Sequence, residues 1–288
     1  MFKLKIKTFL RKNYPNLYEI IKIIYSRIIF KRKNNIKFSG WGLTTTQSPP
    51  WIGTSKNKTY IGFKNAKDIL YNKIKQNKFY LSQFYSHPEI KNFDDVIEMF
   101  EQLDYRHYII YYSALLAFEN THSRNIVECG TCDGLTIFFS IAKYKEDNNF
   151  KAYLYDSWSE MKSEHLLTKK EKEKAGDYKY LNIDTTKKNL SDFQSNLIFN
   201  KGYIPEVFKN SDNPKNISWL HIDLNSSMPT QESLKLFYPI LEKNGVIVLD
   251  DYGWDGFEET REVVEDFFID KKITFLHLIT GQALIIKR

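Results

Sequence analysis

Carboxylate side chains stand at the ends of three apolar segments in the C-terminal half of the chain. Asp156 ends one segment, Asp223 ends a second, and the neighbouring pair Asp250 and Asp251 ends a third. Carboxylates can accept hydrogen bonds from ribose hydroxyls, ligate hard divalent cations and take protons from reacting hydroxyl groups. Whether these four act together depends on the elements that position them.

The segments that carry these acids belong to a regular alternation of short apolar runs and longer amphipathic runs. We predict strands at 124–128, 151–156, 197–201, 218–223, 245–250, 273–279 and 283–286, and helices at 105–119, 135–143, 185–195, 230–243 and 258–268. This alternation is typical of an α/β fold with a doubly wound, mostly parallel sheet and helices on both faces. The last two strands form a hairpin, which places an antiparallel strand at or near one edge.

Ligands of open α/β sheets bind beyond the carboxyl ends of the strands, so the acids there are predicted to converge. Asp223, Asp250 and Asp251 would repel one another unless a cation or protons compensate them. A ligand set made of oxygen atoms favours Mg²⁺. The alternative interpretation is that one aspartate caps the following helix and another pairs with a lysine.

A turn with two glycines follows the first strand, in the run Glu128-Cys129-Gly130-Thr131-Cys132-Asp133-Gly134. Gly130 and Gly134 permit a tight turn and a close approach of the backbone to a ligand. Their spacing differs from the G-x-G-x-x-G pattern of dinucleotide sites. Cys129 and Cys132 have no second ligand pair for zinc and are interleaved with the glycines, so we expect neither a zinc site nor a redox site.

Asp156 ends the second strand, 28 residues after Glu128, which suits one strand–helix–strand unit. A carboxylate at that position can accept hydrogen bonds from both hydroxyls of a ribose. The alternative interpretation is that Asp156 caps a helix or a turn.

The basic character of the chain, +7 overall, lies in the N-terminal arm at 1–37, which has eleven Lys or Arg and one acid. The rest of the chain is therefore net acidic, and this disfavours nucleic acid as a partner. An apolar stripe along the arm predicts an amphipathic helix, which either docks on the body or a partner subunit or contacts an anionic membrane. We expect no signal peptide and no transmembrane helix, and thus a cytoplasmic protein, either free or peripheral to the inner face of the membrane.

Residues 38–104 separate the arm from the alternating region. Residues 38–58 are rich in Gly, Pro, Ser and Thr and are predicted to form an irregular loop, while 59–104 are predicted to form short helices. Loops of this length are commonly functional. We interpret 38–104 as a part that binds the acceptor or acts as a lid, and 105–288 as the catalytic domain.

Four stretches of the chain resemble the class I S-adenosylmethionine-dependent methyltransferases, and specifically the macrocin O-methyltransferase family, which methylates sugar hydroxyls. The resemblance covers about 105–288. It is carried by Val127-Glu128-Cys129-Gly130 with Gly134, by Tyr155-Asp156-Ser157-Trp158, by Lys201-Gly202-Tyr203-Ile204-Pro205-Glu206, and by Leu220-His221-Ile222-Asp223-Leu224-Asn225 with the following run to Asp250-Asp251-Tyr252.

The resemblance implies a seven-stranded, Rossmann-like sheet with a helical N-terminal extension and a donor site at the first strand ends. The residues assigned to S-adenosylmethionine are Glu128, Gly130, Gly134, Asp156, Ser157 and Gly202, and those assigned to Mg²⁺ are Asp223, Asp250 and Asp251. The family usually has Asp at the position of Asn225 and Tyr at that of Ser227, so the metal ligands or the acceptor contacts differ here.

A hydroxyl acceptor needs a base to take its proton, and we predict Asp223 for this role, with His221 as the second candidate. The predicted function is Mg²⁺-assisted O-methylation of a sugar or glycosylated small molecule. The alternatives are an RNA or other small-molecule methyltransferase and a non-catalytic protein that binds the donor or docks on a membrane. Either a small molecule or a glycan would be the acceptor, and a homo-oligomer is compatible with the arm.

Overall fold

The computed structural model describes residues 14, 17, 58–86, 90–101, 103–144 and 149–288. The chain divides into two compact units, Met1–Thr44 and Thr45–Arg288, and only two residues of the first are described. The account below concerns the second unit. The predicted amphipathic arm at 1–37, apart from those two residues, and the predicted loop at 38–58, apart from residue 58, lie outside the described residues.

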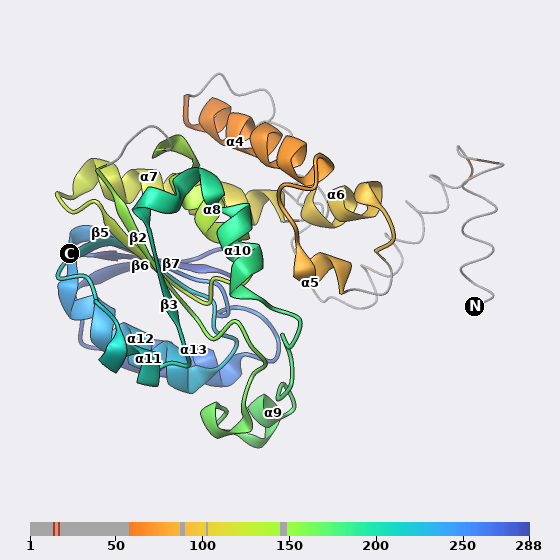
Figure 1. The fold of residues 1–288 in the computed structure, drawn as a ribbon. Helices are drawn as coiled ribbons and strands as arrows, with labels where there is room; N and C mark the ends of the chain where they lie inside the picture. Colours follow the sequence, from red (N-terminus) through yellow and green to blue (C-terminus); the bar gives the residue numbers. More distant parts are fainter. Residues whose placement is uncertain (1–13, 15–16, 18–57, 87–89, 102, 145–148) are drawn as a thin grey trace. The chain divides into compact units, whose positions relative to one another are not determined.

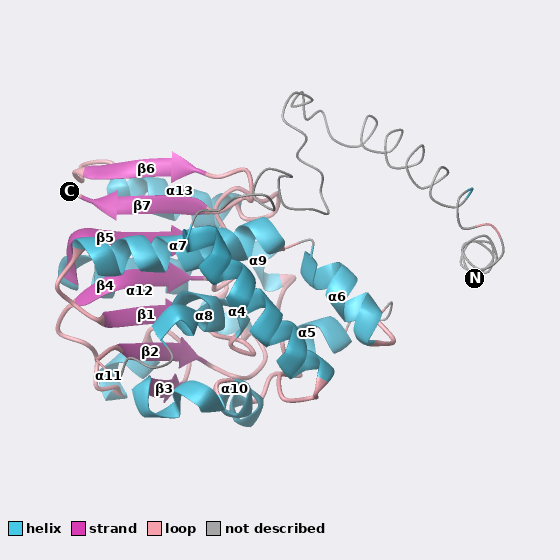
Figure 2. Cartoon of the chain, turned by 90° about the horizontal axis from the view of Figure 1, so that it is seen from above, coloured by secondary structure: helices cyan, strands magenta, loops and turns pink. Residues whose placement is uncertain are grey.

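The second unit contains a seven-stranded sheet in the order β3-β2-β1-β4-β5-β7-β6. The strands are β1 (Asn125–Cys129), β2 (Lys151–Asp156), β3 (Leu197–Lys201), β4 (Ile217–Ile222), β5 (Leu241–Leu249), β6 (Ile273–His277) and β7 (Ala283–Lys287). Strands β1 to β5 pair in parallel, and β7 runs antiparallel to both β5 and β6, as Figure 2 shows. The predicted doubly wound sheet, with an antiparallel strand near one edge, is confirmed.

Helices cover both faces of the sheet (Figure 1). The described helices are α4 (Lys58–Lys75), α5 (Ser82–Tyr85), α6 (Phe93–Glu101), α7 (Asp104–Asn120), α8 (Leu135–Ile141), α9 (Lys169–Lys172), α10 (Ile183–Asn189), α11 (Glu206–Asn210), α12 (Ser227–Ile240) and α13 (Glu258–Phe268). Helices α7, α8 and α10 lie on one face, and α11, α12 and α13 lie on the other. Figure 2 shows α5 and α6 beyond the carboxyl ends of the parallel strands.

Two apolar clusters, one on each face, hold these layers together. In the fully buried strand β4, Trp219 packs into the cluster that includes α4, α7 and α8, and Leu220 packs into the cluster that includes α12 and α13. Successive side chains of a strand point to opposite faces, so a strand buried on both sides is apolar throughout. The helices packed on both faces therefore hold the sheet in place, and with it the carboxyl ends of its parallel strands.

Some element boundaries differ from the predicted ones. The helix predicted at 230–243 is α12, which begins at Ser227 and ends at Ile240, and the chain continues directly into β5 at Leu241. Instead of only short helices, 59–104 includes the 18-residue helix α4. Helices α9 and α11 were not predicted. Among the described residues, no helix is long and apolar enough to cross a membrane.

Candidate functional site

The turn between β1 and α8 is built around Gly130, whose φ is +88°. A Cβ at this position would lie 1.8 Å from the backbone oxygen of Asp223, so a larger residue would push β4 away. The Gly130 N–H donates to Tyr155 O at 2.8 Å, and the Asp223 N–H donates to Cys129 O at 2.9 Å. The glycine therefore lets the ends of β1, β2 and β4 come together.

Asp156 ties the end of β2 to this turn. Its Oδ2 accepts from the Cys132 N–H at 2.8 Å and its Oδ1 accepts from the Trp158 N–H at 2.6 Å. The buried Trp158 donates through Nε1 to Cys132 O and to Thr186 Oγ1. Burial raises the pKa of Asp156, and the backbone hydrogen bonds oppose that rise. Asp156 thus performs the capping role of the alternative interpretation while it also lines the cavity described next.

A cavity of about 510 Å³ lies across the carboxyl ends of the five parallel strands. One half is lined by Gly130, Asp156 and Gly202, which follow or end β1, β2 and β3, and the other half by Asp223 and Asp251, which follow β4 and β5. This is the switch point of the sheet, since the chain leaves β1 for β2 on one side and returns to β4 on the other.

Residues that precede the sheet form part of the cavity wall. Leu81 and Phe84, from the region of α5, line the cavity. This region is fastened to the donor-side turn because Asp133 accepts from Ser82 Oγ at 2.8 Å, and Asn189 donates to both Tyr80 O and Asp133 O at 2.8 Å. Part of the predicted lid region therefore lies at the site.

Arg106, in the first turn of α7, reaches the acidic cluster at the other end. Its Nε donates to Asp250 Oδ1 at 3.1 Å, and its Nη2 donates to Asp250 Oδ2 and, at 3.1 Å, to Asp223 Oδ2. The guanidinium thus grips one carboxylate with two nitrogens and bridges to a second. Such two-pronged contacts between Arg and a carboxylate are the strong, geometrically specific ones.

Asp250 is almost fully buried, and the contacts to its two oxygens are all made by donors. Besides Arg106, Gln282 Nε2 donates to Oδ1 at 2.6 Å, and His221 Nε2 lies 3.1 Å from Oδ2. Burial alone would raise the pKa of Asp250, but Arg106 and His221 hold it well below its usual range. The carboxylate is therefore ionised and surrounded by donors.

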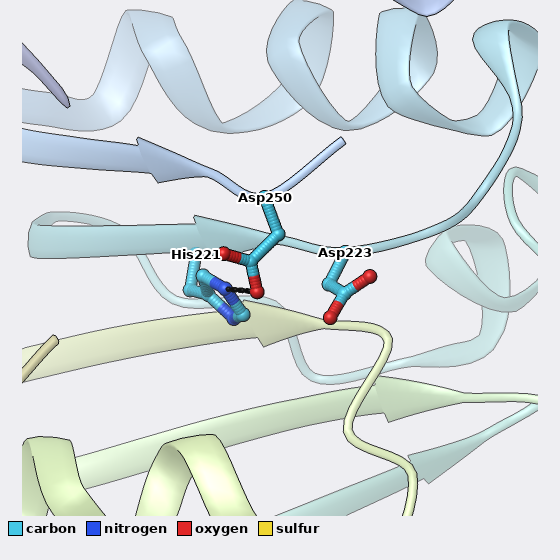
Figure 3. Close-up of side chains that lie close together, drawn as sticks. All are labelled: His221, Asp223 and Asp250. Carbon is cyan, nitrogen blue, oxygen red and sulfur yellow. Dashed lines mark hydrogen bonds and ion pairs between the residues drawn. The ribbon is translucent and has the colours of Figure 1, made fainter. Parts of the chain in front are cut away.

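His221 lies within the sheet, with both ring nitrogens engaged. Nδ1 is 3.1 Å from Glu128 Oε1 and Nε2 is 3.1 Å from Asp250 Oδ2, as Figure 3 shows for the latter contact. Burial lowers the pKa of His221, but the two neighbouring carboxylates raise it to about 10. Burial raises the pKa of Glu128. Neither His221 nor Glu128 lines the cavity.

Asp223 and Asp251 face the cavity instead. Asp251 Oδ2 accepts from the Asn225 N–H at 2.6 Å, and Asn225 Nδ2 lies 3.5 Å from Asp223 Oδ1. Burial and the neighbouring carboxylates raise the pKa of Asp223 well above its usual range and that of Asp251 to about 6. Protonation of these groups is thus easier than for ordinary aspartates, which suits a group that exchanges a proton with an acceptor.

The ligand set that the resemblance assigns to Mg²⁺ does not fit a metal as the chain arranges it. Among the described residues, the group whose ligand atoms lie within 4.8 Å of one another contains Asp223 and Asp250 with His221 in place of Asp251, as Figure 3 displays. Nevertheless, donors contact both oxygens of Asp250, both nitrogens of His221 face carboxylates, and Arg106 stands between Asp250 and Asp223. A metal ligand needs a free lone pair directed at the ion. A cation could bind Asp250 only if Arg106 moved.

The predicted site residues fall into two groups. The cavity is lined by Gly130, Asp156, Ser157, Gly202, Asp223 and Asp251. The residues that lie outside its lining are Glu128, Gly134, His221 and Asp250. Gly134 begins α8 with a φ of +86°, and a Cβ there would meet Leu190, so its role in the structure is packing. The roles assigned to all these residues stay predictions.

Several residues at the site were not predicted. Arg106 is the most consequential, and the available signal was that it is the only Lys or Arg in the helix at 104–120. Tyr178, Trp254 and Phe257 also line the cavity, and Trp254 is 52% exposed. The structure also shows that Asp223 and Asp250 share an arginine as their basic partner.

Comparisons with known proteins place the catalytic part of the chain. Residues 127–252 match the model of a family described as a methyltransferase domain. Among solved structures, the O-methyltransferase NovP is similar, with a TM-score of 0.52 and 16% identity over 64% of this chain and 79% of that chain. The calicheamicin methyltransferase CalS11 has a TM-score of 0.49 and 12% identity over 81% of this chain and 94% of that chain. No curated protein matches the chain.

The fold and the matched domain together define the class. Residues 127–252 form a methyltransferase domain, the sheet has the class I, Rossmann-like architecture, and the domain match implies S-adenosylmethionine as the methyl donor. The likeness to NovP at this identity concerns the fold, so membership of the macrocin family stays a prediction.

Proposed function

We propose that this chain transfers a methyl group from S-adenosylmethionine to a hydroxyl oxygen of a sugar or a glycosylated small molecule. The observation that carries the proposal is the cavity itself, which joins a donor half at Gly130, Asp156 and Gly202 to an acidic half at Asp223 and Asp251. A transfer reaction needs both substrates in one enclosure, with the reacting atoms in contact.

The donor half has the features that an adenosyl group requires. Gly130 and Gly202 present backbone without side chains, and Asp156 supplies a carboxylate beside them. The oxygens of Asp156 accept from the backbone of Cys132 and Trp158, and in the proposed complex the ribose hydroxyls would donate to the same carboxylate. The neighbouring residues Tyr203 and Ile204 line the same end and offer apolar surface for a purine ring.

The acidic half has a group that can take the proton of the acceptor. In the proposed reaction an oxygen lone pair of the acceptor forms the new O–CH₃ bond while the S–CH₃ bond breaks. The electrons of the broken bond stay on sulfur, which becomes a neutral thioether, and the hydroxyl proton passes to Asp223. The accessible position of Asp223 on the cavity wall favours it over the enclosed His221.

The aromatic side chains of the acceptor half support a sugar as the acceptor. Tyr178, Trp254 and Phe257 line this end of the cavity next to the carboxylates. Sites for small polar molecules combine apolar or aromatic walls with a few polar groups that fix the orientation of the ligand. NovP, which is similar in fold, is an O-methyltransferase, and this agrees with oxygen as the methylated atom. A bound Mg²⁺ remains a prediction from the sequence. The position of Arg106 supports a site without a metal ion.

The proposal is tested in two steps with the full chain. Calorimetry with S-adenosylmethionine and its demethylated product measures donor binding, for which Asp156→Asn is the site variant and Asp266→Asn, an exposed acid on α13, is the matched control. Mass spectrometry then follows methyl transfer to a panel of nucleotide sugars and glycosides, with RNA as a further acceptor. Transfer to RNA alone would replace the sugar proposal, and absent donor binding would refute enzymatic methyl transfer.

A further inference from the structure

Arg106 occupies the position between Asp223 and Asp250 that a bridging cation would take. The guanidinium contacts both carboxylates through Nη2 and grips Asp250 through Nε as well. Two other donors, Gln282 Nε2 and His221 Nε2, approach the same carboxylate within 3.1 Å. Each oxygen of Asp250 is contacted by two donors, so Asp250 has no acceptor position left for an ion.

The backbone that carries Arg106 is held in place. The adjacent Asp104 forms an ion pair with Lys67 at 3.0 Å. The buried ring of His107 stacks between Phe139, at 4.8 Å, and Phe100, at 5.1 Å. The first turn of α7 is thus fixed on both sides of Arg106, and the guanidinium cannot leave the carboxylates by a simple shift of the helix.

The protein itself supplies a permanent positive charge at this end of the cavity. Asp223 and Asp250 both contact Arg106 from α7, and Asp250 also contacts His221 from β4. A cluster of buried carboxylates needs compensating positive charge to be stable. Here this charge is covalently part of the chain, so no bound ion is required for the cluster to form.

We propose that Arg106 replaces the divalent cation at this site, so that the chain binds no metal at Asp223 and Asp250 and transfers methyl groups without one. This inference rests on the proposed function for its catalytic consequence but not for its metal-binding consequence. Arg106 also lines the cavity, and no hydrogen bond of its Nη1 is found among the residues that the structure describes. That nitrogen is therefore free to donate to the acceptor oxygen, where it would stabilise the negative charge that develops as the proton leaves.

The direct test is a titration of the full chain with Mn²⁺, whose electron paramagnetic resonance signal is lost on binding to protein. We expect the wild type to bind Mn²⁺ no more tightly than about 1 mM, the weak end of the range for oxygen-ligand sites. Arg106→Gln should expose Asp223 and Asp250 and tighten Mn²⁺ binding by at least about tenfold, because it leaves two buried carboxylates without their cation. Arg288→Gln, which removes an exposed arginine at the C-terminus, is the matched control and should behave as the wild type.

Arg106→Lys provides a second test in case Arg106→Gln does not fold. Lysine keeps the positive charge but cannot contact a carboxylate with two nitrogens. The lysine variant should fold, as judged by circular dichroism, and bind Mn²⁺ more tightly than the wild type. Micromolar Mn²⁺ binding by the wild type that disappears in Asp223→Asn would overturn the proposal, as would folded Arg106 variants that bind no more tightly than the wild type. Donor binding is measured in the same samples. If the wild type binds no S-adenosylmethionine, the proposed function is refuted. The Mn²⁺ titration then still decides whether Arg106 replaces a metal ion.

Discussion

Asp250→Asn should destabilise this protein more than an ordinary loss of one charge would. The carboxylate of Asp250 is 1% exposed and receives donors from Arg106, His221 and Gln282. An asparagine has one oxygen and one NH₂ group in place of the two oxygens. The NH₂ group of the asparagine would therefore face other donors, and Arg106 would lose the carboxylate that it contacts with two nitrogens, keeping only Asp223.

The magnitude follows from the contacts that are lost. Removing one partner of a buried ion pair costs about 3–5 kcal/mol, because the other charge stays buried without compensation. Here Asp223 still contacts Arg106 at 3.1 Å, which places the expected loss towards the lower end of that range. For a domain of this size, a loss of about 3–5 kcal/mol lowers the melting temperature by roughly 6–20 °C.

The assay is urea denaturation followed by tryptophan fluorescence, supported by a thermal melt of the same variants. Asp266→Asn, which removes an exposed acid from α13, is the matched control and should change the free energy of unfolding by less than about 0.5 kcal/mol. If Asp250→Asn lost less than about 1 kcal/mol with an unchanged m-value, the carboxylate would not be the anchor of the cluster. The assignment of Arg106 as its cation would then be refuted on structural grounds.

Three further substitutions probe the two halves of the cavity. Gly130→Ala should abolish donor binding in calorimetry and reduce stability by a few kcal/mol, about 2–4, because its Cβ would lie 1.8 Å from Asp223 O at a φ of +88°. Asp156→Asn should weaken donor binding by about 2 kcal/mol, roughly thirtyfold, and an unchanged affinity would remove Asp156 from the donor site. Asp223→Asn should lower the turnover number at least about a hundredfold in a methyl-transfer assay while donor affinity is preserved, and a turnover near that of the wild type would exclude it as the base.

The sheet and its ligand-binding edge could be predicted from the sequence because they depend on local patterns. Strand β2 was predicted at its observed bounds, since an apolar run that ends in Asp156 is unambiguous. Some of the residues that were predicted to converge on one site do converge, because they directly follow neighbouring paired strands. Asp223 and Asp251, for example, both follow parallel strands and line the same cavity.

The direction of individual side chains could not be predicted in the same way. Glu128 lies one residue before the end of β1 and pairs in register with Leu154 and His221, so it sits two residues further from the carboxyl edge than Asp156, and there it meets His221. A strand-end argument treats Glu128 and Asp156 alike, although the register places only Asp156 on the cavity. Arg106 was not predicted for another reason. It lies 117 residues before Asp223 in the chain, on a helix whose other side chains are mostly apolar, and only the tertiary fold brings the two side chains together.

The contact between Arg106 and the acids also bears on how the two halves of the chain cooperate. The carboxylates belong to the sheet, whereas Arg106 begins the helix that connects the sheet to α4, α5 and α6. Because α5 also lines the cavity and is fastened to the donor-side turn through Asp133, the same preceding segment touches both ends of the site. A change that loosens the first turn of α7 would thus disturb the acidic cluster and the cavity wall together. A metal ion would have tied the acids only to one another, but an arginine ties them to the part of the chain that forms one wall of the cavity.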